Sequence, residues 1–199
     1  MKAKETALML IEFQNDFCKE GGKLYDAVKD EIKRHNVLEN AVKLLTGARE
    51  KGVRIVHIPF LLNAEWSKET AIEGVIGSLR DGEIFVPGTW GAEIVDELKP
   101  REDETILQGK RALNGFVHTN LADVLASLKV KNIGVAGFLT NVCAQATAMG
   151  AYDRGYRTRL ITDACGATSE KIQRFVEDEI CPLFGGKPSV DVFLSEIEA

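Results

Sequence analysis

The 199-residue sequence contains few of the residues that build disulfide or metal frameworks, with only four cysteines and three histidines. The cysteines lie far apart and form no Cys-x-x-Cys pair. A disulfide scaffold is therefore not expected, and reduced thiols of a cytoplasmic protein are predicted instead. The histidines are equally scattered, at His35, His57 and His118, so we expect no metal site.

Long runs of one kind of residue are also missing. No five consecutive residues carry like charges, and the net charge is −5, which argues against a nucleic-acid partner. No apolar run approaches the ~18 residues of a membrane helix. The N-terminus has no small-residue cleavage site of a signal peptide, so a cytoplasmic location away from membranes is predicted. The length fits one domain, which we expect to span residues 1–199.

Buried strands alternate with helices along the chain. Continuous apolar runs predict strands at 7–11, 54–58, 104–108, 132–138 and 157–162, with a weaker sixth at 190–194. Apolar residues at three- and four-residue intervals predict helices at 28–50, 119–129, 141–153 and 169–181. This order predicts an α/β fold of three layers, α/β/α, with a doubly wound, mostly parallel six-stranded sheet. The less regular residues 60–100 are predicted to form a lid or an oligomer contact.

Three reactive side chains follow three of the predicted strands. Glu12 follows the first strand, Lys110 comes shortly after the third, and Cys143 lies where a helix should begin after the fourth. Ligands of open parallel sheets bind at the carboxyl ends of the strands, so we expect the three to meet there. Singly, a strand-end lysine is commonly solvated and a free cysteine is commonly a core residue.

Together these groups suit nucleophilic catalysis. A helix N-terminus and a nearby cation favour the thiolate, which attacks an electrophilic carbon. A carboxylate takes the thiol proton and later activates water. Backbone N–H groups of the turn before Cys143 are candidates for an oxyanion hole.

The chain resembles the isochorismatase-like cysteine hydrolase superfamily in three blocks of sequence. These blocks are "LIEFQNDF", "GKRALNGFVHTNL" and "GFLTNVCAQATAMGAYDRGYRTRLITDACGATS". The resemblance runs from about residue 5 to residue 195. Its members include nicotinamidases, N-carbamoylsarcosine and ureidoacrylate amidohydrolases, and isochorismatases. The resemblance implies a six-stranded parallel sheet between helices and assembly into dimers or tetramers.

By position, Cys143 matches the family nucleophile and Lys110 the catalytic lysine. The resemblance also implies a cis peptide bond between Phe138 and Leu139, and an oxyanion hole formed by the N–H groups of Leu139 and Cys143. Glu12 stands where the family has an aspartate, and its extra methylene lengthens the side chain by ~1.5 Å. We expect Glu12 to act as the base, although about 1 Å of misplacement can cost on the order of a hundredfold in rate.

Nicotinamidases of this family hold a metal through an Asp-x-His pattern and further histidines after the second strand. This chain has His57 alone in that region, within the strand. The resemblance therefore implies no metal and no other cofactor here, and a nicotinamidase assignment is not expected. For the substrate pocket we expect Phe17, Trp90 and Phe116 as apolar walls. Gln14 and Asn15 are candidates for hydrogen bonds to the substrate, but Asn15 and Asp16 are more often turn-forming or capping residues. Asp16 is expected to have a structural role and is kept as a reserve acid.

The leading hypothesis is a metal-independent cysteine hydrolase that cleaves a C–N bond of a small amide, carbamoyl or ureido substrate through a Cys143 thioester. Two alternatives stay open. One is vinyl-ether hydrolysis of the isochorismatase type, which needs an acid and no thiol. The other is a non-catalytic member of the fold that only binds a small molecule.

Overall fold

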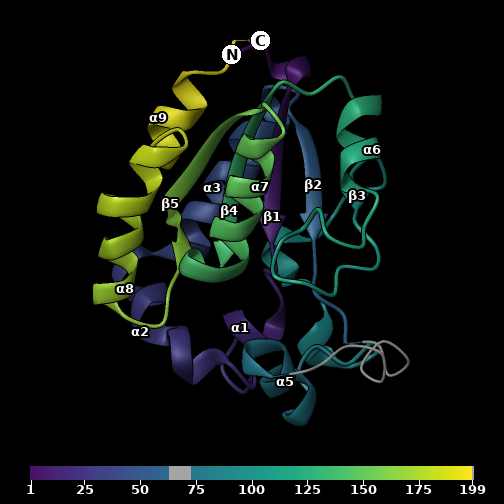
Figure 1. Ribbon diagram of the computed structural model, residues 1–199, viewed down its shortest axis with the longest axis vertical. Helices are drawn as coiled ribbons and strands as arrows, with labels where there is room; N and C mark the ends of the chain where they lie inside the picture. The colour runs from purple at the N-terminus through teal and green to yellow at the C-terminus, as the bar shows by residue number, and fades with distance from the viewer. Residues whose placement is uncertain (63–72, 199) are drawn as a thin grey trace.

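The protein is a three-layer α/β/α sandwich in the computed structural model, which describes residues 1–62 and 73–198 (Figure 1). The strands are β1 (Thr6–Ile11), β2 (Arg54–Ile58), β3 (Thr105–Ile106), β4 (Asn132–Phe138) and β5 (Arg157–Gly166). The longer helices are α2 (Tyr25–His35), α3 (Val37–Glu50), α5 (Gly74–Asp81), α6 (Leu121–Ser127) and α7 (Gln145–Asp153). Shorter helices are α1 (Asn15–Cys18), α8 (Glu170–Phe175) and α9 (Val190–Ser195). Helix α7 lies in front of the sheet and α3 behind it.

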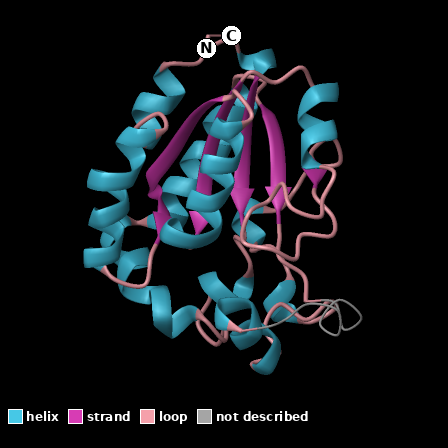
Figure 2. Cartoon of the chain, in the orientation of Figure 1, coloured by secondary structure: helices cyan, strands magenta, loops and turns pink. Residues whose placement is uncertain are grey.

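The strands form one parallel sheet in the order β3-β2-β1-β4-β5, so all five arrows in Figure 2 point the same way. The central strands β1 and β4 are buried along their whole length, as expected of strands covered by helices on both faces. At Gly137 the backbones of β4 and β1 approach so closely that a Cβ atom would lie 2.0 Å from the Ile11 carbonyl oxygen. Only glycine fits there.

The predicted sixth strand is wrong, because residues 190–194 form helix α9 instead. Ser189 caps this helix by accepting a hydrogen bond from the Val192 N–H at 3.3 Å. Val190 and Phe193 are buried three residues apart, which is helical and not strand spacing. The predicted strand at 104–108 is shortened to the two residues of β3. Among the described residues the sheet therefore has five strands.

The predicted helix at 28–50 is two helices, α2 and α3, that meet at Asn36. Asn36 has φ 48°, a left-handed conformation that ends the first helix before the second begins. Helices α2 and α3 pack against each other, and both lie close to β5. Helix α3 also packs on α9. One cluster of buried hydrophobic residues runs through these layers.

Side chains of Gln14, Asn15 and Asp16 fasten the segment around residues 85–92 to the end of β1. The Gln14 amide donates to the carbonyl oxygens of Phe60 at 2.9 Å and Ala92 at 2.8 Å. Asp16 accepts the Phe85 N–H at 2.9 Å. These side chains are thus engaged with backbone, which agrees with the structural role expected of Asn15 and Asp16, whereas Gln14 was expected to contact the substrate. Residues 63–72 of the predicted lid or oligomer contact lie outside the described residues.

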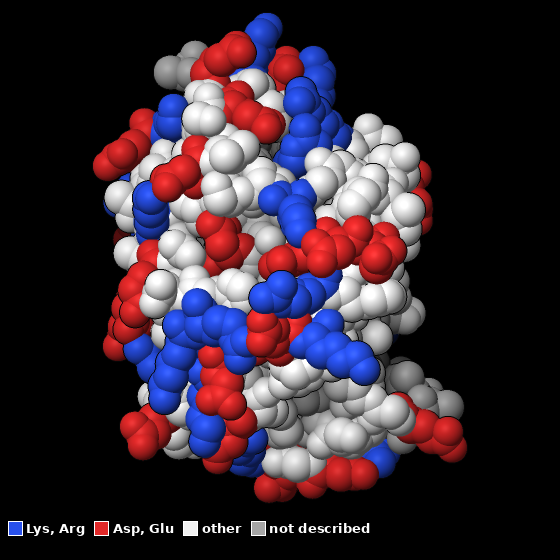
Figure 3. Space-filling model, turned by 90° about the vertical axis from the view of Figure 1, so that its left-hand side faces the viewer, with Lys and Arg blue, Asp and Glu red and all other residues white. Residues whose placement is uncertain are grey.

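The face that carries α8 and α9 mixes charges of both signs. Figure 3 shows Lys and Arg side chains interleaved with Asp and Glu over this face, consistent with the small net charge. None of the helices in the described part of the chain is long and apolar enough to cross a membrane.

Candidate active site

Glu12, Lys110 and Cys143 come together at the carboxyl ends of β1 and β4 and in the loop after β3. The Lys110 ammonium donates a hydrogen bond to the Glu12 carboxylate. The Cys143 thiol lies within hydrogen-bonding reach of both groups. All three are buried, with exposed fractions of 2% for Glu12, 1% for Lys110 and 6% for Cys143. The structure thus unites the three residues at the edge of the sheet where ligands bind.

Glu12 is positioned by an unusual backbone conformation directly after β1. Its φ of 54° is left-handed, which is uncommon for a residue other than glycine. Its N–H donates to the Ile58 carbonyl at the end of β2, at 3.0 Å, so the turn stays attached to the sheet. Left-handed residues of this kind concentrate at functional sites. This backbone conformation turns the Glu12 side chain away from the side-chain directions of β1 and places its carboxylate beside Lys110.

Lys110 is held by three partners inside the protein. Besides Glu12, its ammonium donates to the Ala112 carbonyl oxygen at 2.8 Å and lies 4.8 Å from the centre of the Phe60 ring. Burial lowers the pKa of the Lys110 amine, but the Glu12 carboxylate and Cys143 raise it by more, so this pKa lies above its ordinary value. Lys110 therefore stays charged at neutral pH.

Cys143 lies in a π-helical turn, Thr140–Ala144, between β4 and α7. The Leu139 carbonyl accepts the N–H groups of Val142 at 3.0 Å and Ala144 at 3.2 Å, which closes the turn around the cysteine. The peptide bond between Phe138 and Leu139 is cis, at the position that the resemblance implied. Thr140 anchors the turn to α8 by donating to the Gln173 side-chain oxygen at 2.7 Å.

The Cys143 thiol differs from the sequence-based expectation of a thiolate. Burial raises the pKa of Cys143, and the Glu12 carboxylate raises it further, whereas Lys110 lowers it by less. The net direction is upward, so the resting group at neutral pH is the neutral thiol. The expected lowering of this pKa is therefore wrong, because the negative charge of Glu12 offsets the lysine and water is excluded. A neutral thiol needs a base at the moment of attack, and Glu12 is within reach to serve as one.

This electrostatic balance predicts that replacing Glu12 speeds the alkylation of Cys143, although the same change should slow the hydrolysis of a substrate. In Glu12→Gln the negative charge is gone while Lys110 remains, so the pKa of the thiol falls and more thiolate is present at pH 7. We expect iodoacetamide to alkylate Cys143 several-fold faster in Glu12→Gln than in the wild type, measured by peptide mass spectrometry. Cys18, also buried and with a raised pKa, is the internal control and keeps its rate. Slower alkylation of Cys143 in the variant would contradict this account.

A cavity of about 120 Å³ opens beside the thiol and is lined by both Glu12 and Cys143. Phe17 lines it, as the sequence analysis expected. The other two expected pocket residues do not belong to the described lining. Trp90 is 50% exposed, and its backbone carbonyl accepts from the Asn15 side chain at 2.8 Å. Phe116 is buried under the Arg154 guanidinium, whose central carbon lies 4.4 Å from the ring centre.

Sequence reasoning missed most of the cavity wall. The missed lining residues include Leu24, Val28, Leu79, Ile84, Val142 and Thr168. They come from α2 and the residue before it, from α5 and the turn after it, from the nucleophile turn and from the loop after β5. Helices α2 and α5 lie beyond the carboxyl ends of the strands (Figure 1). In the sequence, the apolar residues of these helices look like those of any helix that faces the core. Only their place above the strand ends makes them pocket residues.

His57 belongs to a separate buried group on β2. Its Nε2 lies 2.9 Å from Glu104 Oε2, and Arg49 contacts the same carboxylate through two nitrogens at 2.6 and 2.9 Å. Burial lowers the pKa of His57, against the raising effect of Glu104, so the ring is neutral at pH 7 and donates its N–H to the carboxylate. In residues 1–62 and 73–198 no group of three or more His, Cys, Asp or Glu side chains could hold a metal ion.

Glu104 makes folding stability depend on pH in the acid range. Burial raises its pKa, but hydrogen bonds from Arg49, the Arg101 N–H and His57 outweigh this and hold the pKa at about 2, below the ordinary value of 4.5 for a glutamate. A lowered folded pKa stabilises the protein above the unfolded pKa, and this stabilisation is lost as pH falls through the folded pKa. We expect Glu104→Gln to lower the free energy of unfolding by about 3 kcal/mol at pH 7 and by less than half of that at pH 3.

Urea unfolding at the two pH values measures this difference. The exposed neighbour Glu102, for which Glu102→Gln is the matched control, should change the unfolding free energy little at either pH. An equal loss for Glu104→Gln at pH 7 and pH 3 would show that the carboxylate charge does not stabilise the fold.

Comparison with known proteins agrees with this fold. A family model described as the isochorismatase domain matches residues 6–185. The chain belongs to the isochorismatase family. An uncharacterized isochorismatase family protein of Bacillus subtilis is 32% identical over 89% of this chain and 84% of its own length. A ureidoacrylate amidohydrolase of Rhizobium rhizogenes is 29% identical over 82% of this chain and 71% of its own.

Solved structures share the fold across nearly the whole chain. A cysteine hydrolase from Pseudomonas syringae superposes with a TM-score of 0.86 at 24% identity, covering 98% of this chain and 93% of its own. An N-carbamoylsarcosine amidase from Thermoplasma acidophilum superposes with a TM-score of 0.74 at 21% identity, covering 96% and 98%. At these identities the superpositions establish the α/β architecture of the family, and the chemistry depends on the site itself.

Proposed function

We propose that the protein is a hydrolase that cleaves a C–N bond of a small amide, carbamoyl or ureido compound, with Cys143 as nucleophile and no metal. One observation carries this proposal: the buried Glu12–Lys110 pair lies within hydrogen-bonding reach of Cys143, which lines the same cavity as Glu12. Burying two charges is costly, so their retention beside a thiol at a cavity points to chemistry. The names of two relatives, ureidoacrylate amidohydrolase and N-carbamoylsarcosine amidase, support the C–N bond class.

The arrangement supports a two-step reaction. In the first step the Glu12 carboxylate accepts the thiol proton while Sγ of Cys143 attacks the substrate carbonyl carbon. The tetrahedral intermediate collapses, the C–N bond breaks, and the leaving nitrogen takes the proton as ammonia or an amine. This leaves a thioester on Cys143. In the second step Glu12 accepts a proton from water, the hydroxide attacks the thioester, and the acid product and the free thiol are released.

Lys110 has an electrostatic role in this proposal. Its ammonium is the direct partner of the Glu12 carboxylate and holds that side chain in place beside the thiol. It also offsets the negative charge that develops on the sulfur and the substrate oxygen. The N–H groups of Leu139 and Cys143, from the turn after the cis peptide bond, are proposed to stabilise that oxygen. Assembly into a dimer or tetramer, also implied by the resemblance, stays a prediction.

Vinyl-ether hydrolysis is the weaker candidate because it needs no thiol. The cavity brings Cys143 and Glu12 to the same wall, which nucleophilic catalysis uses and enol-ether protonation does not. A role limited to binding would leave the buried ion pair beside the thiol without a purpose.

Ammonia release from a panel of small amides and ureas tests the proposal. We expect turnover of at least one compound, and a covalent adduct of the acyl part on Cys143 when the reaction is quenched and the protein is analysed by intact-mass spectrometry. Hydrolysis without any adduct, and with full activity after Cys143 is blocked, would overturn the thioester route.

A further inference from the structure

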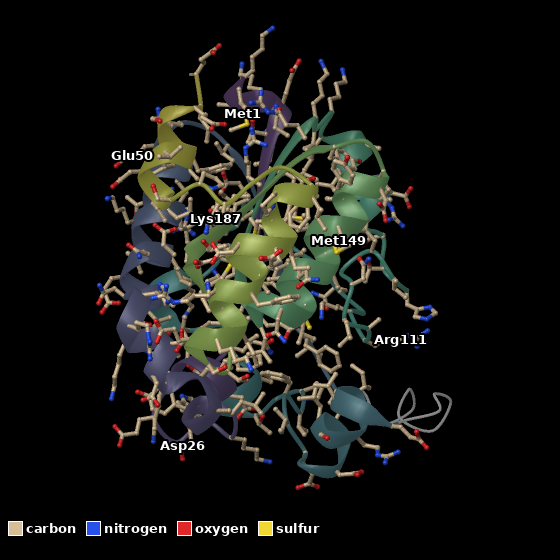
Figure 4. The ribbon with its side chains drawn as sticks, turned by 60° about the vertical axis from the view of Figure 1, so that its left-hand side comes forward. Met1, Asp26, Glu50, Arg111, Met149 and Lys187 are labelled. Atoms are coloured by element: carbon tan, nitrogen blue, oxygen red, sulfur yellow. The ribbon has the colours of Figure 1, made fainter. Side chains whose placement is uncertain are left out.

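The cavity beside Cys143 is apolar on the side away from the reacting groups. Ten of its fourteen lining residues are apolar. Leu24 comes directly before α2, Val28 from α2, Leu79 from α5, and Ile84 from the turn that follows α5. Both helices lie at the lower end of the molecule, with Asp26 marking α2 in Figure 4. They form an aliphatic wall facing the thiol.

We infer that the substrate carries, beside the C–N bond that is cleaved, a compact, uncharged aliphatic group seated against α2 and α5. This inference rests on the function proposed above. Apolar cavities of roughly 150 Å³ take a guest the size of benzene, so a cavity of about 120 Å³ suits a branched group of three or four carbons. Such a group gains free energy by leaving water for an aliphatic wall.

The charge of the cavity opposes an anionic substrate. Glu12 is the only charged residue among those that line it in the described part of the chain. The Lys110 ammonium is already engaged by Glu12 and the Ala112 carbonyl. A carboxylate in this space would lose its water without gaining a partner cation and would lie close to a second carboxylate. This sets the chain apart from the two named relatives, whose names denote carboxylic acids, acrylate and sarcosine.

Leu79 and Ile84 are the residues we assign to substrate specificity. Each is 7% exposed, so their side chains are nearly closed off from solvent. Ile84 is fixed to α5 by its N–H, which donates to the Leu79 carbonyl at 2.9 Å. This bond holds the two side chains next to each other in the wall, and shortening either of them enlarges the space for the aliphatic group.

Two amides of the same shape test the inference. In 3-methylbutanamide an isopropyl group occupies the place that a carboxylate occupies in malonamate. We expect kcat/KM for ammonia release to be at least about a hundredfold higher for 3-methylbutanamide. Binding is measured separately on Cys143→Ala by ligand-observed NMR, with 3-methylbutanamide bound and malonamate unbound at the same concentration. Equal or better binding of malonamate would overturn the inference.

Leu79→Ala and Ile84→Ala test the wall itself. For each variant the ratio of kcat/KM for 3-methylbutanamide to that for acetamide should fall about tenfold, because acetamide lacks the group that the wall contacts. Val192→Ala, on the exposed side of α9, is the matched control and should keep the wild-type ratio. An unchanged ratio in both cavity variants would show that the aliphatic group lies elsewhere.

These measurements separate the two proposals. If amides are hydrolysed through Cys143 but malonamate is preferred, the substrate inference fails and the proposed function stands. If no amide or urea releases ammonia while Cys143→Ala binds 3-methylbutanamide selectively, the proposed function fails and the ligand class of the cavity stands.

Discussion

Replacement of Cys143 by alanine is expected to abolish ammonia release, with a loss of about a thousandfold or more in kcat. The reason is that the thiol forms the thioester in the first step of the proposed reaction and is the leaving group in the second. None of the other cysteines lines the cavity in the described part of the chain. Steady-state kinetics on whichever amide or urea the wild type hydrolyses measures the loss. Cys143→Ser, which keeps a hydroxyl at this position, should be nearly as inactive, because a serine hydroxyl is harder to deprotonate.

Cys18→Ala is the matched control for this experiment. Cys18 is buried like Cys143, but it ends α1 and does not line the cavity. The Cys18→Ala variant should retain turnover, with at most a modest loss in the free energy of unfolding. If Cys143→Ala hydrolyses the substrate at the wild-type rate, the carboxylate must act without the thiol, and vinyl-ether or general-base chemistry becomes the better account.

Glu12→Gln is expected to lower kcat by about a hundredfold to ten-thousandfold, the usual range for removal of a general acid–base group. The amide keeps the size and the hydrogen-bonding shape of the side chain but cannot accept the thiol proton. The same change leaves the Lys110 ammonium buried without its carboxylate. Breaking a buried ion pair in this way costs about 3–5 kcal/mol, so the free energy of unfolding should fall as well.

The loss of activity must be separated from the loss of folding. Kinetics are therefore measured at a temperature well below the midpoint of unfolding of the variant, with circular dichroism as the check on folding. Glu20→Gln, an exposed glutamate shortly after α1, should change neither quantity. Wild-type kcat in Glu12→Gln would show that Glu12 is not the base. Slow hydrolysis together with faster alkylation of Cys143 would be the expected signature of a lost base.

Glu12→Asp asks whether the extra methylene is needed. The Glu12 carboxylate reaches Lys110 directly from a left-handed backbone. Shortening the side chain withdraws the carboxylate by ~1.5 Å unless the backbone follows. We expect on the order of a hundredfold loss in kcat/KM, measured with the same substrate. Higher activity of Glu12→Asp would show that glutamate at this position is a compromise.

Local pattern in the sequence determined most of the fold. The continuous apolar runs at 54–58 and 132–138 form β2 and β4 with the predicted bounds. A strand covered on both faces has apolar residues without polar alternation, so its limits can be recognised in the sequence. The same rule misled at 190–194, where an apolar run fits a helix as well as a strand. Ser189 at the cap and the three-residue spacing of Val190 and Phe193 decided for the helix.

The sequence by itself also determined which chemical groups meet. Glu12, Lys110 and Cys143 follow strands, and the carboxyl ends of parallel strands share one edge, so their meeting follows from topology. What only the tertiary structure decided is their electrostatic state and their surroundings. The thiol is neutral because burial and the Glu12 charge outweigh Lys110, and the cavity wall is aliphatic because α2 and α5 happen to close over it. Both depend on distances between segments far apart in the chain, which local pattern does not encode.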